Sequence, residues 1–246
     1  MTPCEEWLTT LGDGTTRWGI FSAVRDPFVA ETLAEVGYDW VLVDLQHGMA
    51  DPADLAGLLQ AIEAGGAAAV VRVAAHDPAL IGRALDLGAW AVVVPMIDSA
   101  EQAAEAVAAA RYAPEGTRSF GPIRGRAPIS EQPRILAMVE TATALRSVDE
   151  ICAVPGLLGV FVGPSDLAIS LGVDVDYEVG SGVHHEALAT VAAAAKRAGV
   201  VAAVQTAGAD EARLRVEQGY HLVSMRSDWL VLREAAQRML AAAAAI

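Results

Sequence analysis

Short apolar runs recur along the chain, and most are followed by a segment whose apolar positions are spaced as on one face of a helix. The runs are WGIFSAV (18–24), WVLVDLQ (40–46), AAVVRVA (68–74), AVVVPMI (91–97), RILAMVE (134–140), LGVFVGP (158–164), VVAAVQT (200–206) and HLVSMRS (221–227). Continuous apolar runs are typical of strands covered on both faces. The helical segments begin at Asp, Ser or Pro and end at Gly. Eight such units in 246 residues predict an α/β fold, a (β/α)8 TIM barrel formed as a single domain by residues 1–246.

Polar side chains fall where several of these strands end. Asp44 and His47 follow the second strand, Arg72 lies in the third, Glu140 ends the fifth and Asp166 follows the sixth. In a parallel barrel the C-terminal ends of the strands meet at one face, where sites are built. Two carboxylates on neighbouring strands can share a Mg²⁺ or Mn²⁺ ion. The pattern therefore predicts a metal site with a potential base and a cation beside it.

Each of these residues also has a structural interpretation. Glu140 and Asp166 can stabilise the helices that they precede, because acidic groups interact favourably with helix N-termini. His47 can be a half-buried histidine beside a turn. Arg72 lies within an apolar strand and requires an anionic partner, which can be an acid of the barrel itself. The remaining histidines lack a metal-ligand spacing and are interpreted as surface or loop residues: His76, His184, His185 and His221.

Composition excludes several other functions. The formal net charge of −14 argues against nucleic acid or an anionic membrane as a partner. The apolar runs are too short for a membrane span and no signal sequence is recognisable, so a cytoplasmic location is expected. Lys196 is the only lysine and lies near the end of a helix, which makes a Schiff-base mechanism and a PLP cofactor unexpected. No GxGxxG follows the first strand, so no nucleotide is expected, and Cys4 and Cys152 imply no disulfide framework.

Two connections are long. Residues 113–133 are rich in Gly, Pro and Arg and are expected to form a loop over the C-terminal face of the barrel. Residues 173–184 are acidic and contain glycine, and are also expected to form a loop. Long loops in compact domains are commonly functional.

Six segments together resemble one protein family. They are VDLQHG (43–48), VVRV (70–73), ALDLGAWAVVVPMIDSAEQA (84–103), RYAPEGTRSFGP (111–122), MVETATAL (138–145) and FVGPSDLAISLG (161–172). In this order they are similar to the HpcH/HpaI family of metal-dependent class II pyruvate aldolases. The family includes 4-hydroxy-2-oxoheptanedioate and 2-dehydro-3-deoxyglucarate aldolases. The chain departs from the family pattern at two places: members often read Gly-Glu-His where it has Leu45-Gln46-His47, and they often have Gln where it has Met138.

The resemblance implies a role for individual residues. Glu140 and Asp166 match the metal ligands, and His47 matches the general base. Arg72 matches the arginine that stabilises the enolate. Asp86 matches an acid that supports the histidine from a neighbouring subunit. The backbone of Ser165 and Asp166 would bind the pyruvate carboxylate at a helix N-terminus, where amide groups favour an anion.

The resemblance also implies the reaction and the assembly. A barrel of the phosphoenolpyruvate/pyruvate type would cleave a 4-hydroxy-2-oxo acid reversibly to pyruvate and an aldehyde, using Mg²⁺, Mn²⁺ or Co²⁺. A homo-oligomer, trimeric or hexameric, is implied, with the C-terminal helix packed on a neighbour. Two alternatives remain open: a carbon–carbon lyase of the citryl-CoA or malyl-CoA type, and a non-catalytic barrel that binds a 2-oxo acid. The identity of the aldehyde stays open.

Overall fold

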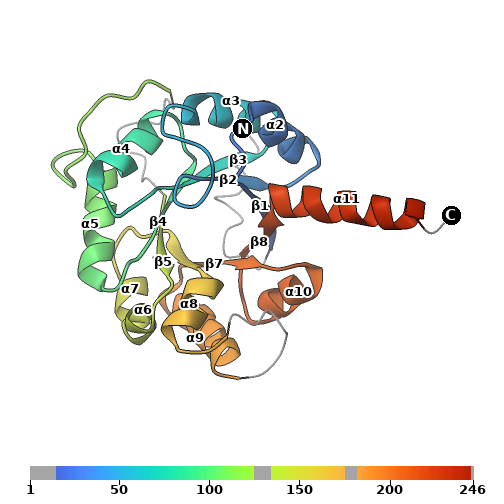
Figure 1. Cartoon of the computed structure of the whole chain (residues 1–246). Coiled ribbons are helices and arrows are strands. Elements are labelled where there is room, and N and C mark those ends of the chain that lie inside the picture. The colour runs from blue at the N-terminus through green and yellow to red at the C-terminus, as the bar shows by residue number, and fades with distance from the viewer. Residues whose placement is uncertain (1–14, 125–133, 175–181, 245–246) are drawn as a thin grey trace.

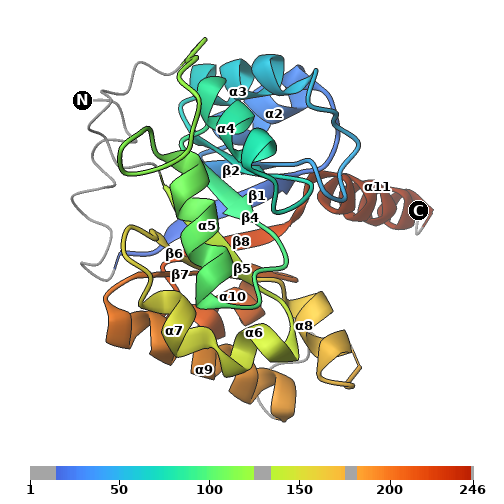
Figure 2. The ribbon, with the colours of Figure 1, turned by 90° about the vertical axis from the view of Figure 1, so that its left-hand side faces the viewer.

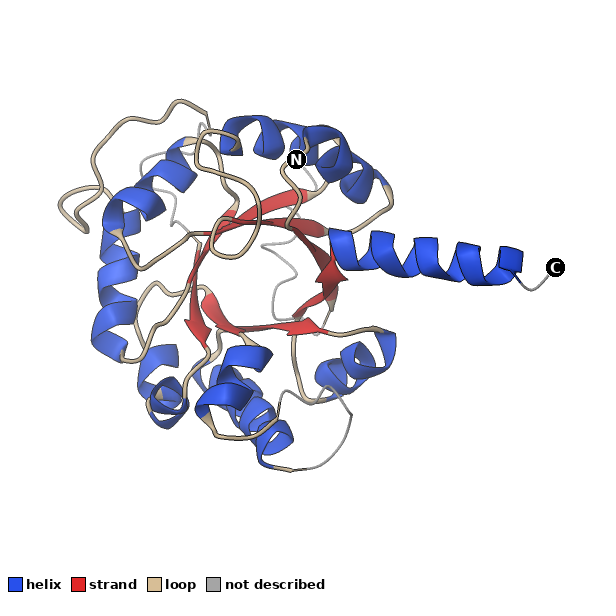
Figure 3. Cartoon of the chain, in the orientation of Figure 1, coloured by secondary structure: helices blue, strands red, loops and turns tan. Residues whose placement is uncertain are grey.

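Eight parallel strands form a closed barrel in the computed structural model, which describes residues 15–124, 134–174 and 182–244. The strands are β1 (Arg17–Ser22), β2 (Trp40–Asp44), β3 (Ala68–Arg72), β4 (Ala91–Val94), β5 (Ile135–Val139), β6 (Gly159–Val162), β7 (Val201–Thr206) and β8 (Leu222–Ser227). Each strand pairs with the next along the chain, and β8 closes the ring on β1. Figure 3 shows this ring with helices around it. The predicted (β/α)8 barrel is confirmed.

Helices alternate with the strands, and all except the C-terminal helix pack around the barrel (Figure 1). They are α2 (Pro27–Glu35), α3 (Leu55–Ala64), α4 (Pro78–Asp86), α5 (Ala100–Ala110), α6 (Ala142–Arg146), α7 (Val148–Cys152), α8 (Pro164–Ser170), α9 (Val183–Ala198), α10 (Ala209–Glu217) and α11 (Asp228–Ala244). Side chains cap several N-termini as the sequence predicted. Asp26 accepts from the amides of Phe28 and Val29, and Ser99 from that of Gln102. These bonds satisfy amides that the first helical turn leaves unpaired.

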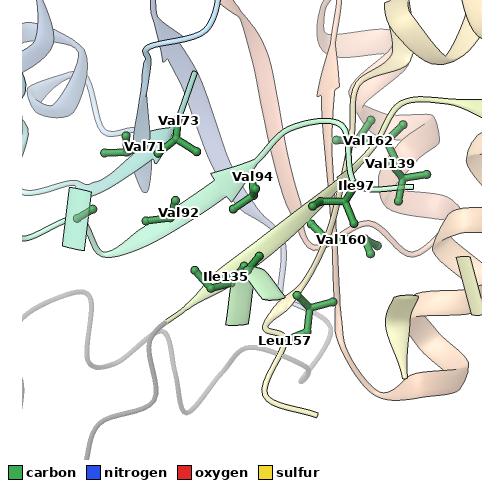
Figure 4. Packing of buried hydrophobic residues seen from close by; sticks show 14 of the residues in the cluster. Val71, Val73, Val92, Val94, Ile97, Ile135, Val139, Leu157, Val160 and Val162 are labelled. Atoms are coloured by element: carbon green, nitrogen blue, oxygen red, sulfur yellow. The ribbon is translucent and has the colours of Figure 1, made fainter. Parts of the chain in front are cut away.

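The core has two layers, one inside the barrel and one between the strands and the helices. Inside, Phe161 makes edge-on contacts with Phe21 and Trp40, with ring centroids 6.0 and 6.3 Å apart. Gly19 leaves room for the Trp40 indole, which a Cβ at position 19 would approach to 2.1 Å. The outer layer consists mainly of valine, isoleucine, leucine and alanine, as Figure 4 shows along β3 to β6. The aliphatic composition therefore reflects a barrel buried on both faces.

The prediction for the long connection after α5 is wrong in its described part. Residues 111–124 lie at the N-terminal end of the strands, not at the C-terminal face. The amides of Ile123 and Arg124 donate to the Asp86 carbonyl at 3.0 and 2.8 Å, and the Arg124 guanidinium pairs with Glu63 at 2.7 Å. Asp86 and Glu63 lie in the last turns of their helices, which run antiparallel to the strands. A connection from helix to strand starts at that end whatever its length; residues 125–133 lie outside the described residues.

The second long connection was predicted from residue 173 to residue 184. Its centre, residues 175–181, lies outside the described residues, but its end does not. His184 belongs to α9 and is buried, so its interpretation as a surface or loop residue is wrong. His184 lies three, four and seven positions before Ala187, Leu188 and Val191, so it is the first residue of the buried face of this helix.

The C-terminal helix α11 differs from the others in its packing. It leaves the barrel after β8 and extends away from it (Figures 1 and 2). Large apolar side chains along it are exposed, with Leu232 at 69%, Met239 at 75% and Leu240 at 72%. No described helix combines the length and the hydropathy that crossing a bilayer would require.

Candidate active site

A buried ion pair joins the ends of β2 and β3. Arg72 donates from Nε to Asp44 Oδ1 at 2.8 Å and from Nη2 to Oδ2 at 2.7 Å. The two residues are also partners in the strand register. The predicted anionic partner of Arg72 is thus an acid of the barrel. Bidentate geometry fixes the plane of the guanidinium as well as its position.

The same carboxylate also holds the turn that carries His47. Asp44 Oδ1 accepts from the amides of Gln46 and His47 at 3.0 and 3.3 Å. Burial alone would raise the pKa of Asp44, but the Arg72 guanidinium and these two amides outweigh it and hold the pKa below its usual value. The ionised Asp44 carboxylate thus orients both the cation and the backbone of the histidine. The His47 side chain itself is exposed at the C-terminal end of the barrel.

Arg72 still has donors directed across the barrel. Its Nη1 lies 3.9 Å from the sulfur of Met138 on β5, and its guanidinium lies 5.3 Å from the centre of the Phe21 ring. A guanidinium has five N–H groups, so the pair with Asp44 does not exhaust them. The side chain is held at 6% exposure with part of its donor capacity facing the centre of the barrel.

Glu140 follows β5 and is 1% exposed. Its Oε1 accepts from the Met96 amide at 2.7 Å, while no described residue donates to Oε2. Burial raises the pKa of Glu140, and the charge of Asp166 adds to this. The Met96 amide and the charges of Arg72 and His47 offset the rise only in part. Glu140 is thus a buried carboxylate without a full counter-charge.

Two residues that the sequence analysis did not single out shape the position of Glu140. Met96 has φ of 56°, a left-handed conformation that is rare for residues other than glycine, and its amide holds Glu140 Oε1. A Cβ at Gly163 would lie 2.7 Å from Glu140 Oε2, so only glycine leaves this space open. Neither feature has a signal in the sequence, because both depend on contacts between β4, β5 and β6.

Asp166 and Ser165 lie in the first turn of α8, which starts at Pro164 directly after β6. Asp166 is exposed and Ser165 half-buried. The structure thus brings His47, Arg72, Glu140 and Asp166 to the same end of the barrel, where the charges of the other three all act on Glu140. The described residues contain no cluster of three or more His, Cys, Asp or Glu suited to a metal.

This pair of acids nevertheless fits a divalent cation. Glu140 lacks a counter-charge at Oε2, and the like charge of Asp166 raises its pKa. A cation between the two carboxylates would remove both penalties. Mg²⁺ and Mn²⁺ are commonly bound by one or two carboxylates, with water and substrate completing the coordination. The donor set is hard oxygen, which matches these metals.

Asp86 is not near His47 within one chain. It ends α4 at the opposite end of the barrel and is half-buried. Its Oδ1 accepts from Arg118 Nη2 at 2.5 Å, and the Arg118 guanidinium lies over the Tyr112 ring at 4.7 Å. The predicted role toward a histidine of a neighbouring subunit stays a prediction.

The fold and this arrangement of groups define a (β/α)8 barrel with an acid pair, an arginine and a histidine at the C-terminal end of its strands, the end where barrel enzymes carry their active sites. The family model of the HpcH/HpaI aldolase/citrate lyase family matches residues 17–235, and the chain belongs to that family.

The relatives are named as aldolases. A hydroxypyruvate/pyruvate aldolase of Rhizorhabdus wittichii is 38% identical, with 88% of this chain and 90% of the relative covered. A 2-dehydro-3,6-dideoxy-6-sulfogluconate aldolase of Pseudomonas putida is 36% identical, with 87% of each chain covered. The structure of an HpcH/HpaI aldolase/citrate lyase family protein from Burkholderia cenocepacia superposes with a TM-score of 0.89 at 33% identity, covering 97% and 98% of the two chains. The predicted carbon–carbon lyase activity of the aldolase type is confirmed, and the two alternative functions are not favoured.

Proposed function

We propose that this aldolase cleaves a 4-hydroxy-2-oxo acid reversibly to pyruvate and an aldehyde, with a divalent cation held by Glu140 and Asp166. The observation that carries the metal site is the buried Glu140 carboxylate, which has one amide partner and a pKa raised by burial and by Asp166. When bound, the cation supplies Lewis acidity to the carboxylate and keto oxygens of the substrate. Mg²⁺, Mn²⁺ and Co²⁺ all suit this role.

His47 moves the proton in the proposed reaction. In cleavage, the proton of the C4 hydroxyl passes to His47, the C3–C4 bond breaks, and its electron pair forms the enolate of pyruvate. The aldehyde carbonyl forms at C4, and the proton on His47 then returns to C3 to give pyruvate. The side chain is exposed to substrate, while its backbone is held by Asp44. Imidazole suits proton transfer near neutral pH.

Arg72 stabilises the enolate oxygen in this mechanism. Its orientation is fixed by two bonds to Asp44, at 2.8 and 2.7 Å, and Nη1 faces the centre of the barrel. Prearranged donors aimed at developing charge are usually a large part of catalysis. The amides of Ser165 and Asp166 in the first turn of α8 would bind the carboxylate of pyruvate.

The enolate step can be tested without knowledge of the aldehyde. Exchange of the pyruvate methyl protons in D₂O should be catalysed by the Mn²⁺-loaded protein and abolished by EDTA. His47→Ala should slow exchange by about 100-fold or more, within the range of general acid–base catalysis. His221→Ala is the matched control, because His221 precedes β8 at the opposite end of the barrel. Absence of exchange in the metal-loaded parent would contradict the proposal.

We further propose that the protein is a homo-oligomer, a trimer or a hexamer, in which α11 packs on a neighbouring copy. The exposed apolar residues Leu232, Met239 and Leu240 support this, since single helices rarely expose such a face without a partner. The ion-paired position of Asp86, far from His47 in its own chain, is consistent with a role across the interface.

The oligomer proposal predicts a linked loss of mass and activity. A Leu232→Asp, Leu240→Asp double variant should sediment as a smaller species than the parent and exchange pyruvate protons more slowly. Gln237→Asp, an exposed polar position on the same helix, should change neither. Full activity in a monomeric double variant would contradict the role of Asp86 in a neighbouring subunit.

A further inference from the structure

The groups of the proposed site do not surround the C-terminal end of the barrel evenly. Asp44, Arg72, Glu140 and Asp166 come from β2, β3, β5 and the turn after β6. The remaining side of the opening is formed by the ends of β7, β8 and β1. We call this the neutral side, defined by Gln205 on β7, Ser224 on β8 and Phe21 on β1.

Gln205 faces the interior of the barrel on this side. Val201 and Ala203 of β7 belong to the cluster inside the barrel, and Ala202 and Val204 to the layer under the helices. Side chains alternate along a strand, so Gln205 shares the inner face with Val201 and Ala203. It is half-buried, whereas Thr206 on the outer face is 2% exposed. The amide is thus within reach of a molecule that enters the barrel from its C-terminal end.

Ser224 lies beside Gln205. The two residues are register partners on β7 and β8, and Leu222, two positions before Ser224, belongs to the inner cluster. Ser224 is fully buried, and its Oγ has no hydrogen-bond partner among the described residues. The Gln205 side chain likewise makes no hydrogen bond within the described part of the chain. A buried hydroxyl without a partner costs about 1–3 kcal/mol, which a ligand hydroxyl or water would recover.

The cations near this side are already paired. Arg226 donates from Nε to the Ala207 carbonyl and pairs through Nη1 with Glu234 at 2.6 Å. Arg25, after β1, lies 3.5 Å from Asp54. The acid on this side, Asp228 directly after β8, is buried, and its two oxygens accept from the amides of Ala23 and Val24 at 3.1 and 3.0 Å. Among the residues that the structure describes, the neutral side thus offers an amide and a hydroxyl, while its arginines and its one acid already have partners. This chemistry suits a neutral hydroxyl group better than a carboxylate.

We propose that Gln205, with Ser224 beside it, hydrogen-bonds a hydroxyl group of the aldehyde partner. The enzyme then prefers a short hydroxyaldehyde to the same aldehyde without the hydroxyl and to one carrying a carboxylate. This inference rests on the proposed function, because it assigns the acceptor of the same aldol reaction. Gln205 is a specificity-determining residue, and the enolate step does not use it.

The test is a competition between two-carbon aldehydes. The Mn²⁺-loaded full-length protein is given pyruvate with equimolar glycolaldehyde and acetaldehyde, then with glycolaldehyde and glyoxylate, and the products are quantified by NMR. Competition cancels differences in the active fraction, and the intrinsic reactivities of the aldehydes are the same for every variant. The variants are Gln205→Leu, Ser224→Ala and Gln60→Leu, an exposed position on α3 that serves as control.

The glycolaldehyde-to-acetaldehyde product ratio should fall about tenfold in Gln205→Leu, the factor that loss of one well-formed hydrogen bond gives, and by less in Ser224→Ala. Gln60→Leu should keep the parent ratio, and pyruvate proton exchange without aldehyde should stay at the parent rate in every variant. An unchanged ratio in Gln205→Leu, or a parent that prefers glyoxylate, overturns the inference. Loss of exchange in the parent itself overturns the proposed function, and with it the acceptor that depends on it.

Discussion

Two buried carboxylates at the C-terminal end of the barrel, Asp44 and Glu140, have opposite electrostatic environments. Both directly end or follow a strand, and they are 4% and 1% exposed. Asp44 receives a bidentate guanidinium and two amides, and its pKa is lowered; Glu140 receives one amide and faces Asp166, and its pKa is raised. Burial penalises both charges, so the difference comes from the partners. One acid completes a structural unit, and the other is suited to an added cation.

The largest expected effect is that of removing the Asp44 charge. Asp44→Asn keeps the shape of the side chain but leaves Arg72 buried without a counter-charge. Breaking one member of a buried ion pair typically costs about 3–5 kcal/mol of unfolding free energy. Urea denaturation of the metal-free protein should show a loss of this size, together with loss of pyruvate exchange because His47 and Arg72 lose their common anchor. A stability within about 1 kcal/mol of the parent would show that the pair does not hold the site.

Glu140→Gln should leave the stability of the metal-free protein intact and weaken metal binding instead. The substitution removes a charge that burial and Asp166 disfavour, so the stability of the metal-free protein should not fall. Mn²⁺ affinity, measured by calorimetry, should decrease by more than about 100-fold, beyond the effect of changing an outer-shell group. Asp98→Asn, at another acid after β4, is a control expected to keep the affinity. Retained Mn²⁺ binding in Glu140→Gln would remove this residue from the metal site.

The sequence predicted where these acids lie but not how they differ. Continuous apolar runs ending in Asp44, Arg72 and Glu140 placed all three at one end of a barrel, because strand order and direction follow from the alternation of strand and helix. The ion pair between Asp44 and Arg72 depends on the register between β2 and β3. That Glu140 accepts from the Met96 amide depends on the loop after β4, in which Met96 has a positive φ. Such contacts are set by packing, which no local pattern contains.

The two wrong predictions, for the long connection after α5 and for His184, were likewise made from local composition and spacing. The connection of residues 113–133 was assigned to the C-terminal face from its length and composition, although its place between α5 and β5 makes it start at the opposite end. His184 was assigned to the surface or a loop because it lacks a metal-ligand spacing, although it lies on the buried face of α9 with Ala187 and Leu188. Connectivity was therefore a better guide than composition, and the candidate site was found through the residues whose position connectivity fixes.

The smallest expected effect, and the finest test of the comparison, is in the pH dependence of two properties. The pKa of Glu140 is raised in the folded protein, so protons compete with the metal for this carboxylate at a higher pH than they would for a free glutamate. Below the pKa of Glu140, metal affinity should fall by up to about tenfold per pH unit. The pKa of Asp44 is lowered in the folded protein, so its carboxylate stabilises the fold fully above the pKa of an unfolded aspartate, about 3.9. This stabilisation is lost only as the pH falls further, through the lowered pKa of the folded state.

On acidification, Mn²⁺ affinity should thus decline while the metal-free protein keeps the stability that the Asp44–Arg72 pair provides. Protonation of Glu140 does not oppose this, because a group with a raised folded pKa favours the folded state as pH falls toward its unfolded pKa. Calorimetric titration with Mn²⁺ and urea unfolding at matched pH values measure the two transitions, and His47→Ala separates the contribution of the histidine charge from that of Glu140. If affinity and stability decline together, the two acids titrate as one unit and the distinction between a paired and an unpaired carboxylate is wrong.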